Sequence, residues 1–282
     1  MLNRVLVFFF AIGLALAIFR GAESEDTASS SDLKTPESWF MFWVRGTVAE
    51  IWKELSYSAP DPVSSAGDSN SIFQSGLDAY NSNRYEEAIE IFDKYIASVP
   101  NDTSAFYNRG LAKYFLERYS EAESDFESAY SADSKNLDAL FSIGNCRVAL
   151  GEPEEGLKKY NRAISLGLNE SYAYVGRARV LNSLQKYKNA LSDAESAIGA
   201  DEQNHNAYFE QAFAYYGIGK YKESVSSYTK VLELDSGMAV AYYNRGLGYE
   251  VLKKKGPACS DFRKAEELGY SSAQEKIEEI CK

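Results

Sequence analysis

Histidine, cysteine and proline are scarce in this chain of 282 residues, which has one His, three Cys and six Pro. The single histidine, His205, leaves no His–Glu or His–His spacing that could bind a catalytic metal, and no Cys-x-x-Cys pair occurs. A glycine-rich phosphate loop and a Gly-x-Ser-x-Gly elbow are missing as well. We therefore expect no enzyme activity, no metal site and no cofactor.

Basic residues are outnumbered, with 30 Lys and Arg against 41 Asp and Glu and a formal net charge of -11. Binding to nucleic acid requires clustered Lys and Arg side chains that contact phosphates, so this excess of acid argues against a nucleic-acid partner. The only basic run is Lys253, Lys254 and Lys255. We expect this run to be a solvated turn between two helices.

A period of 34 residues runs through residues 69–272 without insertion or deletion. One position of each unit is small: Gly76, Gly110, Gly144, Ala178, Ala212 and Gly246. A second small series follows twelve residues later: Ala88, Ala122, Gly156, Ala190, Ser224 and Ala258. A mostly bulky series follows four residues after that: Phe92, Phe126, Tyr160, Ala194, Tyr228 and Phe262.

These series predict paired helices. Small residues let two antiparallel helices approach closely, and the bulky residue fills the space beside the contact. A strict period of this length predicts a stack of helical hairpins, none of which can bury its apolar face alone. The six units that we expect are 69–102, 103–136, 137–170, 171–204, 205–238 and 239–272, followed by a capping helix over 273–282.

Two segments resemble the tetratricopeptide repeat (TPR) family: YNRGLAKYFLERYSEAESDFESAY at residues 107–130 and YYNRGLGYE at residues 242–250. The resemblance implies an all-α solenoid of six hairpins whose first helices line a concave surface that binds extended peptides or partner helices. The chain departs from the family pattern at two points. The proline between repeats occurs only as Pro100, and Ala194 stands where an aromatic residue is usual.

Each first helix has a second face, built from residues spaced i, i+4 and i+7. The resemblance implies that this stripe forms a peptide groove, for which the candidates are Phe73, Tyr80, Tyr107, Asn108, Tyr114, Phe141, Asn145, Phe209, Phe213, Tyr216, Tyr243 and Asn244. Asn108 and Asn244 resemble the asparagines with which the family contacts peptide backbone. Packing between repeats is the alternative for any single ring.

The residues at the start of the stripe bear on the type of ligand. Phe73 and Leu77 stand where a carboxylate clamp of the chaperone-binding type would need a lysine and an asparagine. A C-terminal carboxylate is therefore a poor candidate, and we expect an apolar or aromatic-rich segment of a partner protein.

Arginine and aspartate recur only in the even-numbered repeats. One equivalent position carries the arginines Arg109, Arg177 and Arg245, and another carries the aspartates Asp125, Asp193 and Asp261. The two positions are level on antiparallel helices if the turn lies near the middle of each hairpin, so we infer an Arg–Asp ion pair inside each even repeat and a doubled period. A catalytic acid–base pair is a weak alternative, because arginine stays protonated.

Two of the three cysteines, Cys259 and Cys281, lie eleven residues on either side of Tyr270, where a turn is expected. In an exported protein they should form a disulfide that ties the last helix to repeat 6. The alternative is that both are small buried residues. Cys146 is single, and we expect it to pack between helices.

The N-terminal 22 residues contain an apolar stretch over residues 5–19, flanked by Arg4 and Arg20. Fifteen apolar residues are many for the core of a signal peptide and few for a membrane span of about 20 residues. A cleaved signal peptide and a retained N-terminal membrane anchor both remain open, and a buried helix of a cytoplasmic protein is the third alternative. We predict an extracytoplasmic location, either secreted or membrane-anchored.

Residues 23–38 and 56–68 are polar and read as flexible linkers. Between them, residues 39–55 contain all three tryptophans and predict an aromatic amphipathic helix. Three roles stay open for this segment: contact with a membrane interface, docking on the repeats as a cap or in their groove, and binding to a partner.

The leading functional prediction is a scaffold that presents the stripe to a peptide segment of an envelope or exported protein. The alternative is a self-associating structural component of a cell-envelope assembly, that is, a homo-oligomer. An enzyme with accessory repeats would need a further domain, for which the chain has no room.

Overall fold

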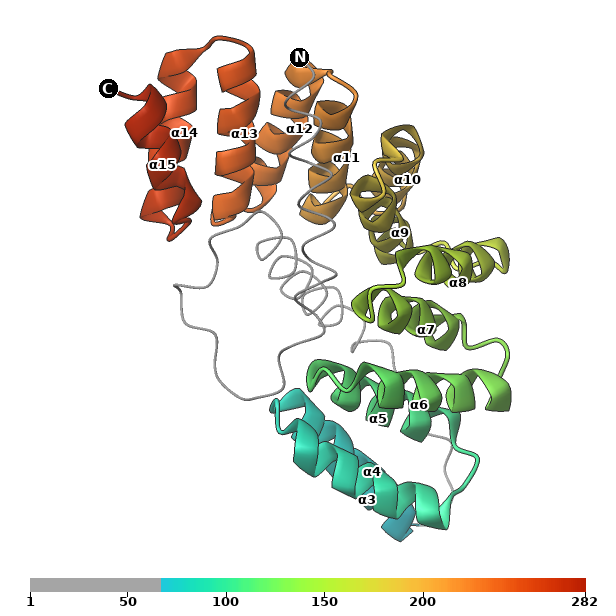
Figure 1. Cartoon of the computed structure of the whole chain (residues 1–282). Coiled ribbons are helices and arrows are strands. Elements are labelled where there is room, and N and C mark those ends of the chain that lie inside the picture. The colour runs from blue at the N-terminus through green and yellow to red at the C-terminus, as the bar shows by residue number, and fades with distance from the viewer. Residues whose placement is uncertain (1–66) are drawn as a thin grey trace. The chain divides into compact units, whose positions relative to one another are not determined.

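The computed structural model describes residues 67–282, and this part of the chain folds into thirteen α-helices, α3 to α15, with no strand among them (Figure 1). Four predicted segments lie wholly or mostly outside the described residues: the apolar segment 1–22, the linker 23–38, the aromatic segment 39–55 and the linker 56–68. Within residues 67–282, no helix combines the length and the apolar character that crossing a bilayer requires.

The first helices of the six repeats are α3 (Gly67–Asn81), α5 (Thr103–Phe115), α7 (Leu137–Ala149), α9 (Ser171–Ser183), α11 (His205–Gly217) and α13 (Ala239–Val251). The second helices are α4 (Tyr85–Ser98), α6 (Tyr119–Ala132), α8 (Pro153–Ser165), α10 (Tyr187–Ala200), α12 (Tyr221–Leu234) and α14 (Lys255–Glu267). The last helix is α15 (Ser272–Ile280), which packs against α14.

In repeats 2 to 6 the first helix begins at the first residue of the unit that the period gives. Three of these starts are capped by a side chain that accepts a backbone N–H bond: Asp102 from Ala105, Asn136 from Ala139, and Asn204 from Asn206 and Ala207. Such caps satisfy N–H groups that have no partner inside the helix. A polar residue therefore helps to fix the start of the hairpin in repeats 2, 3 and 5, whereas α9 and α13 begin without a side-chain cap.

Two predicted boundaries are wrong by one or two residues. Helix α3 begins at Gly67, so the linker predicted over 56–68 ends too late. Glycine weakens the interior of a helix but is tolerated at its first residue. Helix α15 runs from Ser272 to Ile280 rather than over 273–282, and Cys281 forms its C-cap.

Each hairpin turn passes through one residue in the left-handed region of φ. Gly151 and Gly219 occupy this position in repeats 3 and 5, and Asn83, Glu117, Gln185 and Lys253 occupy it in the others, with φ between 57° and 59°. The turn geometry is thus the same in all six repeats although its residue is not.

The prediction of an all-α solenoid is confirmed, since each helix packs against the next along the chain and the hairpins follow one another in sequence order (Figure 1).

The small residues of the repeats allow the two helices of a hairpin to approach closely, as expected. A Cβ atom added at Gly76, Gly110, Gly144 or Gly246 would lie 2.6–2.8 Å from the ring of the bulky residue on the second helix of the same repeat. Phe92, Phe126 and Phe262 have no exposed surface.

Candidate peptide-binding face

The stripe is the set of twelve candidate groove residues on the first helices: Phe73, Tyr80, Tyr107, Asn108, Tyr114, Phe141, Asn145, Phe209, Phe213, Tyr216, Tyr243 and Asn244. The structure buries seven of them below 9% exposure: Phe73, Tyr80, Asn108, Tyr114, Phe141, Asn145 and Phe209. Tyr107, Tyr216, Tyr243 and Asn244 are partly exposed. Phe213 is exposed, at 41%. The interpretation of the whole stripe as an open groove therefore does not hold for its buried members.

The buried rings pack on aromatic residues of the second helices. The ring of Phe73 lies 5.6 Å from that of Phe92, and Phe209 lies 5.4 Å from Tyr228, both edge to face. Phe141 stacks on Tyr160 at 4.4 Å. Aromatic pairs at these distances add stability beyond the area that they bury. The first residue of the i, i+4, i+7 pattern therefore belongs to the core of the hairpin in repeats 1, 3 and 5.

Two stripe asparagines are engaged inside the protein. Asn145 accepts a hydrogen bond of 2.5 Å from the hydroxyl of Tyr160, and Asn108 donates one of 2.8 Å to the carbonyl of Ser104. Asn244 is different, because its side chain makes no hydrogen bond to another residue of the described part. Of the two asparagines that resemble the family's backbone-contacting residues, only Asn244 has its amide available.

The exposed end of the stripe lies on α11 and α13. We use this name for Phe213, Tyr216, Tyr243 and Asn244. Tyr216 packs edge to face on Tyr221 at 5.1 Å, which leaves part of its surface to solvent. These four residues combine apolar ring surface with a free amide, the two features needed to hold an extended peptide.

A buried polar network lies between repeats 4 and 5, and the sequence reasoning missed it. Arg179 on α9 donates to a carboxylate oxygen of Glu210 on α11 at 3.0 Å. Asn182 donates to the other carboxylate oxygen at 2.9 Å. Burial raises the pKa of Glu210, and Arg179 and Asn182 act against this rise. The only signal in the sequence is a glutamate directly after the stripe residue Phe209.

The three predicted Arg–Asp ion pairs are present. Each arginine makes two N–H bonds to one carboxylate: Arg109 to Asp125 at 2.9 and 2.6 Å, Arg177 to Asp193 at 2.7 Å twice, and Arg245 to Asp261 at 2.8 Å twice. The paired geometry is the strong form of this interaction. These residues join the two helices of a hairpin.

Each of these arginines also reaches back to the preceding repeat. The third bond goes to the residue sixteen positions earlier: Asp93 from Arg109, Asn161 from Arg177 and Thr229 from Arg245. The arginines therefore tie repeats 1 to 2, 3 to 4 and 5 to 6. The doubled period has a structural meaning, which is that hairpins are linked in pairs.

Cys259 and Cys281 form a disulfide, with their Cα atoms 5.6 Å apart. It connects α14 to the C-cap residue of α15.

Cys146 is free and buried, and burial raises the pKa of its thiol well above the usual range. Among the described residues, no group of three His, Cys, Asp or Glu side chains is placed to hold a metal ion.

Comparison with known proteins agrees with this architecture. One tetratricopeptide-repeat model matches residues 73–136, 107–167 and 141–205, and a second matches residues 205–237. Together they span more than half of the chain. No curated protein matches the sequence.

Solved structures share the fold. YrrB, described as a TPR protein with an unusual peptide-binding site, is 23% identical with a TM-score of 0.55, over 66% of this chain and 97% of YrrB. The C-terminal part of a TPR repeat-containing protein from Cytophaga hutchinsonii is 23% identical with a TM-score of 0.56, over 70% and 78% of the two chains. MamA from Desulfovibrio magneticus is 20% identical with a TM-score of 0.55, over 60% and 96%.

Identities this low establish the fold alone. The fold is one that presents surfaces for contact between proteins. The unbroken 34-residue period, the stacked hairpins and the matches over residues 73–237 agree with one another. The chain belongs to the tetratricopeptide-repeat family.

Proposed function

We propose that this chain is a non-catalytic scaffold that binds a peptide segment of a partner protein at the exposed end of the stripe. The observation that carries the proposal is the 41% exposure of Phe213, a large apolar ring on a first helix. At the equivalent position Leu111, Asn145 and Arg179 are buried in repeats 2 to 4, and Leu77 and Leu247 are partly exposed in repeats 1 and 6. Repeat 5 is therefore the repeat that exposes an aromatic ring at this position.

The chemistry suits a peptide with apolar or aromatic side chains. Exposed aromatic rings supply contact area at a small cost in side-chain entropy, and they are common anchors in binding sites. The free amide of Asn244 can donate to a peptide carbonyl and accept from a peptide N–H. The peptide-binding site described for YrrB supports peptide recognition as a mode open to this fold.

The disulfide supports the proposal that the chain works outside the cytoplasm, either secreted or held by its N-terminal segment. Disulfides persist in oxidising compartments and are rare in the cytosol. The apolar stretch of residues 5–19 agrees with export. Fractionation of cells, with thiol labelling of Cys259 and Cys281, tests this directly: a reduced pair in a cytosolic fraction would contradict it.

Site-specific photo-cross-linking tests the binding face. A photoreactive phenylalanine analogue at position 213, and another at 244, should yield adducts with a peptide segment of one partner protein. The matched control is the same analogue at Glu195, an exposed residue of the second helix α10. Adducts at 195 but not at 213 would refute the assignment of the face.

The same experiment separates the scaffold from the self-association alternative. Adducts that join position 213 to a second copy of this chain would show that the face is a homo-oligomer contact, and the proposed scaffold function would then be wrong. Adducts to a different protein, lost when an excess of its peptide competes, support the proposal.

A further inference from the structure

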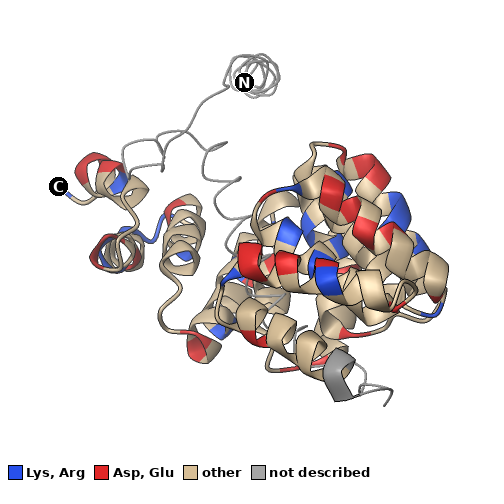
Figure 2. Cartoon of the chain, turned by 90° about the horizontal axis from the view of Figure 1, so that it is seen from below, with Lys and Arg blue, Asp and Glu red and all other residues tan. Residues whose placement is uncertain are grey.

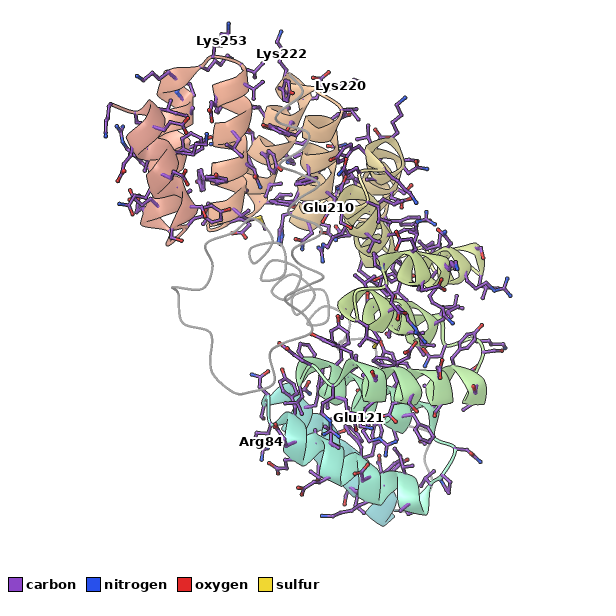
Figure 3. All side chains as sticks on the ribbon, viewed as in Figure 1. Arg84, Glu121, Glu210, Lys220, Lys222 and Lys253 are labelled. Atoms are coloured by element: carbon purple, nitrogen blue, oxygen red, sulfur yellow. A yellow bond between two sulfur atoms is a disulfide. The ribbon has the colours of Figure 1, made fainter. Side chains whose placement is uncertain are left out.

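Lysines gather along one edge of repeats 4 to 6, at the turns between the first and second helices. The lysine edge is defined as Lys186, Lys188, Lys220, Lys222, Lys253 and Lys254. All six side chains are exposed. Because consecutive hairpins stack in order, their turns share one edge, and Figure 3 shows Lys220, Lys222 and Lys253 at the same end of the helices, pointing away from them.

The same edge of repeats 1 to 3 neutralises its own charges. Arg84 pairs with Glu87 at 2.7 Å, and Arg118 pairs with Glu121 at 2.5 Å. The acidic residues at the turn of repeat 3 also form ion pairs, Glu152 with Arg147 and Glu155 with Lys158. Charges of both signs are also interspersed over the helices as a whole (Figure 2).

The lysine edge has no such partners. None of its six side chains forms an ion pair or a hydrogen bond with a described residue. In repeat 5, Glu223 is equivalent to Glu87 and Glu121, which pair with arginines in repeats 1 and 2. Lys220 does not pair with Glu223, and its Nζ lies 5.8 Å from the centre of the Tyr215 ring. Repeats 4 to 6 therefore present six lysines that pair with no described residue, with Glu223 as the one acidic residue in these turns, in a chain whose net charge is -11.

The turn of repeat 6 adds Lys253 to the row, with φ of 59°. The equivalent turn position carries Asn83, Glu117 and Gln185 in repeats 1, 2 and 4 and glycine in repeats 3 and 5, all with positive φ. This backbone conformation is common to all six repeats, and glycine adopts it without a steric penalty.

We propose that the lysine edge docks on anionic phospholipid headgroups in the bilayer leaflet that faces away from the cytoplasm, an inference that rests on the extracytoplasmic location proposed above. The turns of repeats 4 to 6 contain no arginine, which is the residue suited to paired contacts with single phosphates or bases. Lysines act as point charges, which fits a surface of diffuse negative charge. Val251, 43% exposed beside Lys253, adds an apolar side chain at the same edge.

The N-terminal sequence is consistent with this partner. The apolar stretch of residues 5–19 would hold the chain near a bilayer whether it anchors the protein or directs its export. Each lysine near an anionic surface raises affinity about five-fold at moderate ionic strength. The attraction acts over a Debye length of about 8 Å at physiological salt, so acidic residues far from the edge oppose it weakly and Glu223, at the edge, opposes it directly.

The test uses the full chain with two kinds of vesicle, phosphatidylcholine alone and phosphatidylcholine with phosphatidylglycerol. The N-terminal apolar stretch can bind both kinds, so the readout is acetylation of single lysines by an amine-reactive ester, measured by mass spectrometry. We expect anionic vesicles to protect the lysine edge at least three-fold. Lys94 and Lys135, exposed residues away from this edge, should stay unprotected.

Variants then separate docking from simple proximity. The set K186Q, K188Q, K220Q and K222Q with K253G should lower the affinity for anionic vesicles at least ten-fold and leave binding to neutral vesicles unchanged. The glycine at 253 also relieves the backbone, so folding should be kept, as circular dichroism will show. A charge-matched control that removes five positive charges away from this edge, with K94Q, K135Q, R162Q, K230Q and R263Q, should bind like the parent chain.

Three results would overturn the proposal. Equal labelling of the lysine edge in both kinds of vesicle would show that it does not touch the headgroups. Equal loss of binding in the control variant would reduce the effect to net charge. Binding of the edge to a single-stranded oligonucleotide, with no preference for anionic vesicles, would assign it to nucleic acid instead.

Discussion

Arg245 and Asp261 are joined by two N–H···O bonds of 2.8 Å across the hairpin of repeat 6. The Asp261 side chain is only 7% exposed, and Arg245 is its one cationic partner among the described residues. Asp125 in repeat 2 has two cationic partners, Arg109 at 2.6 Å and Lys113 at 2.8 Å. Equivalent ion pairs thus stand in different surroundings.

This difference predicts unequal effects of the same substitution. Arg245→Met leaves a nearly buried carboxylate without a cation, and we expect the free energy of unfolding to fall by about 3 kcal/mol. Arg109→Met leaves Lys113 on Asp125, and its cost should be about half as large. Chemical denaturation of the two variants measures both values. Equal losses would show that the second cation contributes nothing to Asp125.

Gly246 tests the close approach of helices. Its substitution by alanine would place a Cβ atom 2.7 Å from the ring of Phe262, and overpacking of this kind costs about 1–3 kcal/mol. Gly199, in the last turn of α10, has no atom within 4 Å of such a Cβ. Gly199→Ala should therefore stabilise the protein by up to about 1 kcal/mol. A thermal shift in the same direction for both variants would contradict the packing described here.

Thiol counting tests the cysteine assignments. In the folded, oxidised protein an alkylating reagent should modify Cys146 very slowly, because the thiol is buried and the rise in its pKa keeps it protonated. Denaturation without reductant should expose one thiol per chain, and denaturation with reductant should expose three. Rapid modification of the folded protein, or three thiols without reductant, would be inconsistent with this arrangement.

The disulfide should hold the end of the solenoid. It closes a loop of 22 residues, and in the chain-entropy model such a loop contributes roughly 3 kcal/mol. Reduction should speed hydrogen exchange at the amides of α15 while those of α7 keep their protection. Loss of protection throughout the chain on reduction would mean that the disulfide supports more than its own end.

The sequence alone predicted much of the fold, because the period leaves little freedom. A fixed step of 34 residues gave repeat units that begin at Thr103, Leu137 and Ser171, and a first helix starts at each of these residues. The matching positions of arginine and aspartate predicted the ion pairs, since both residues recur in the same repeats. These are features in which local spacing determines the contact.

The exposure of the stripe residues was harder to predict, because helical spacing shows only which residues share a face and not which of them a neighbouring helix covers. Phe209 and Phe213 are four residues apart on α11, yet one is 3% and the other 41% exposed. What separates them is the ring of Tyr228 on the next helix, which covers Phe209. The third bond of each even-repeat arginine was missed for a similar reason, because its partner lies in another repeat.

Phe209 and Phe213 therefore offer the most direct test of the proposed function. Phe209→Ala should cost about 3–5 kcal/mol of stability and impair binding only through loss of fold. Phe213→Ala should change stability by less than about 1 kcal/mol, yet weaken binding of the peptide captured by the position-213 cross-link at least ten-fold by calorimetry. Unchanged affinity of a folded Phe213→Ala variant would contradict the assignment of the peptide-binding face.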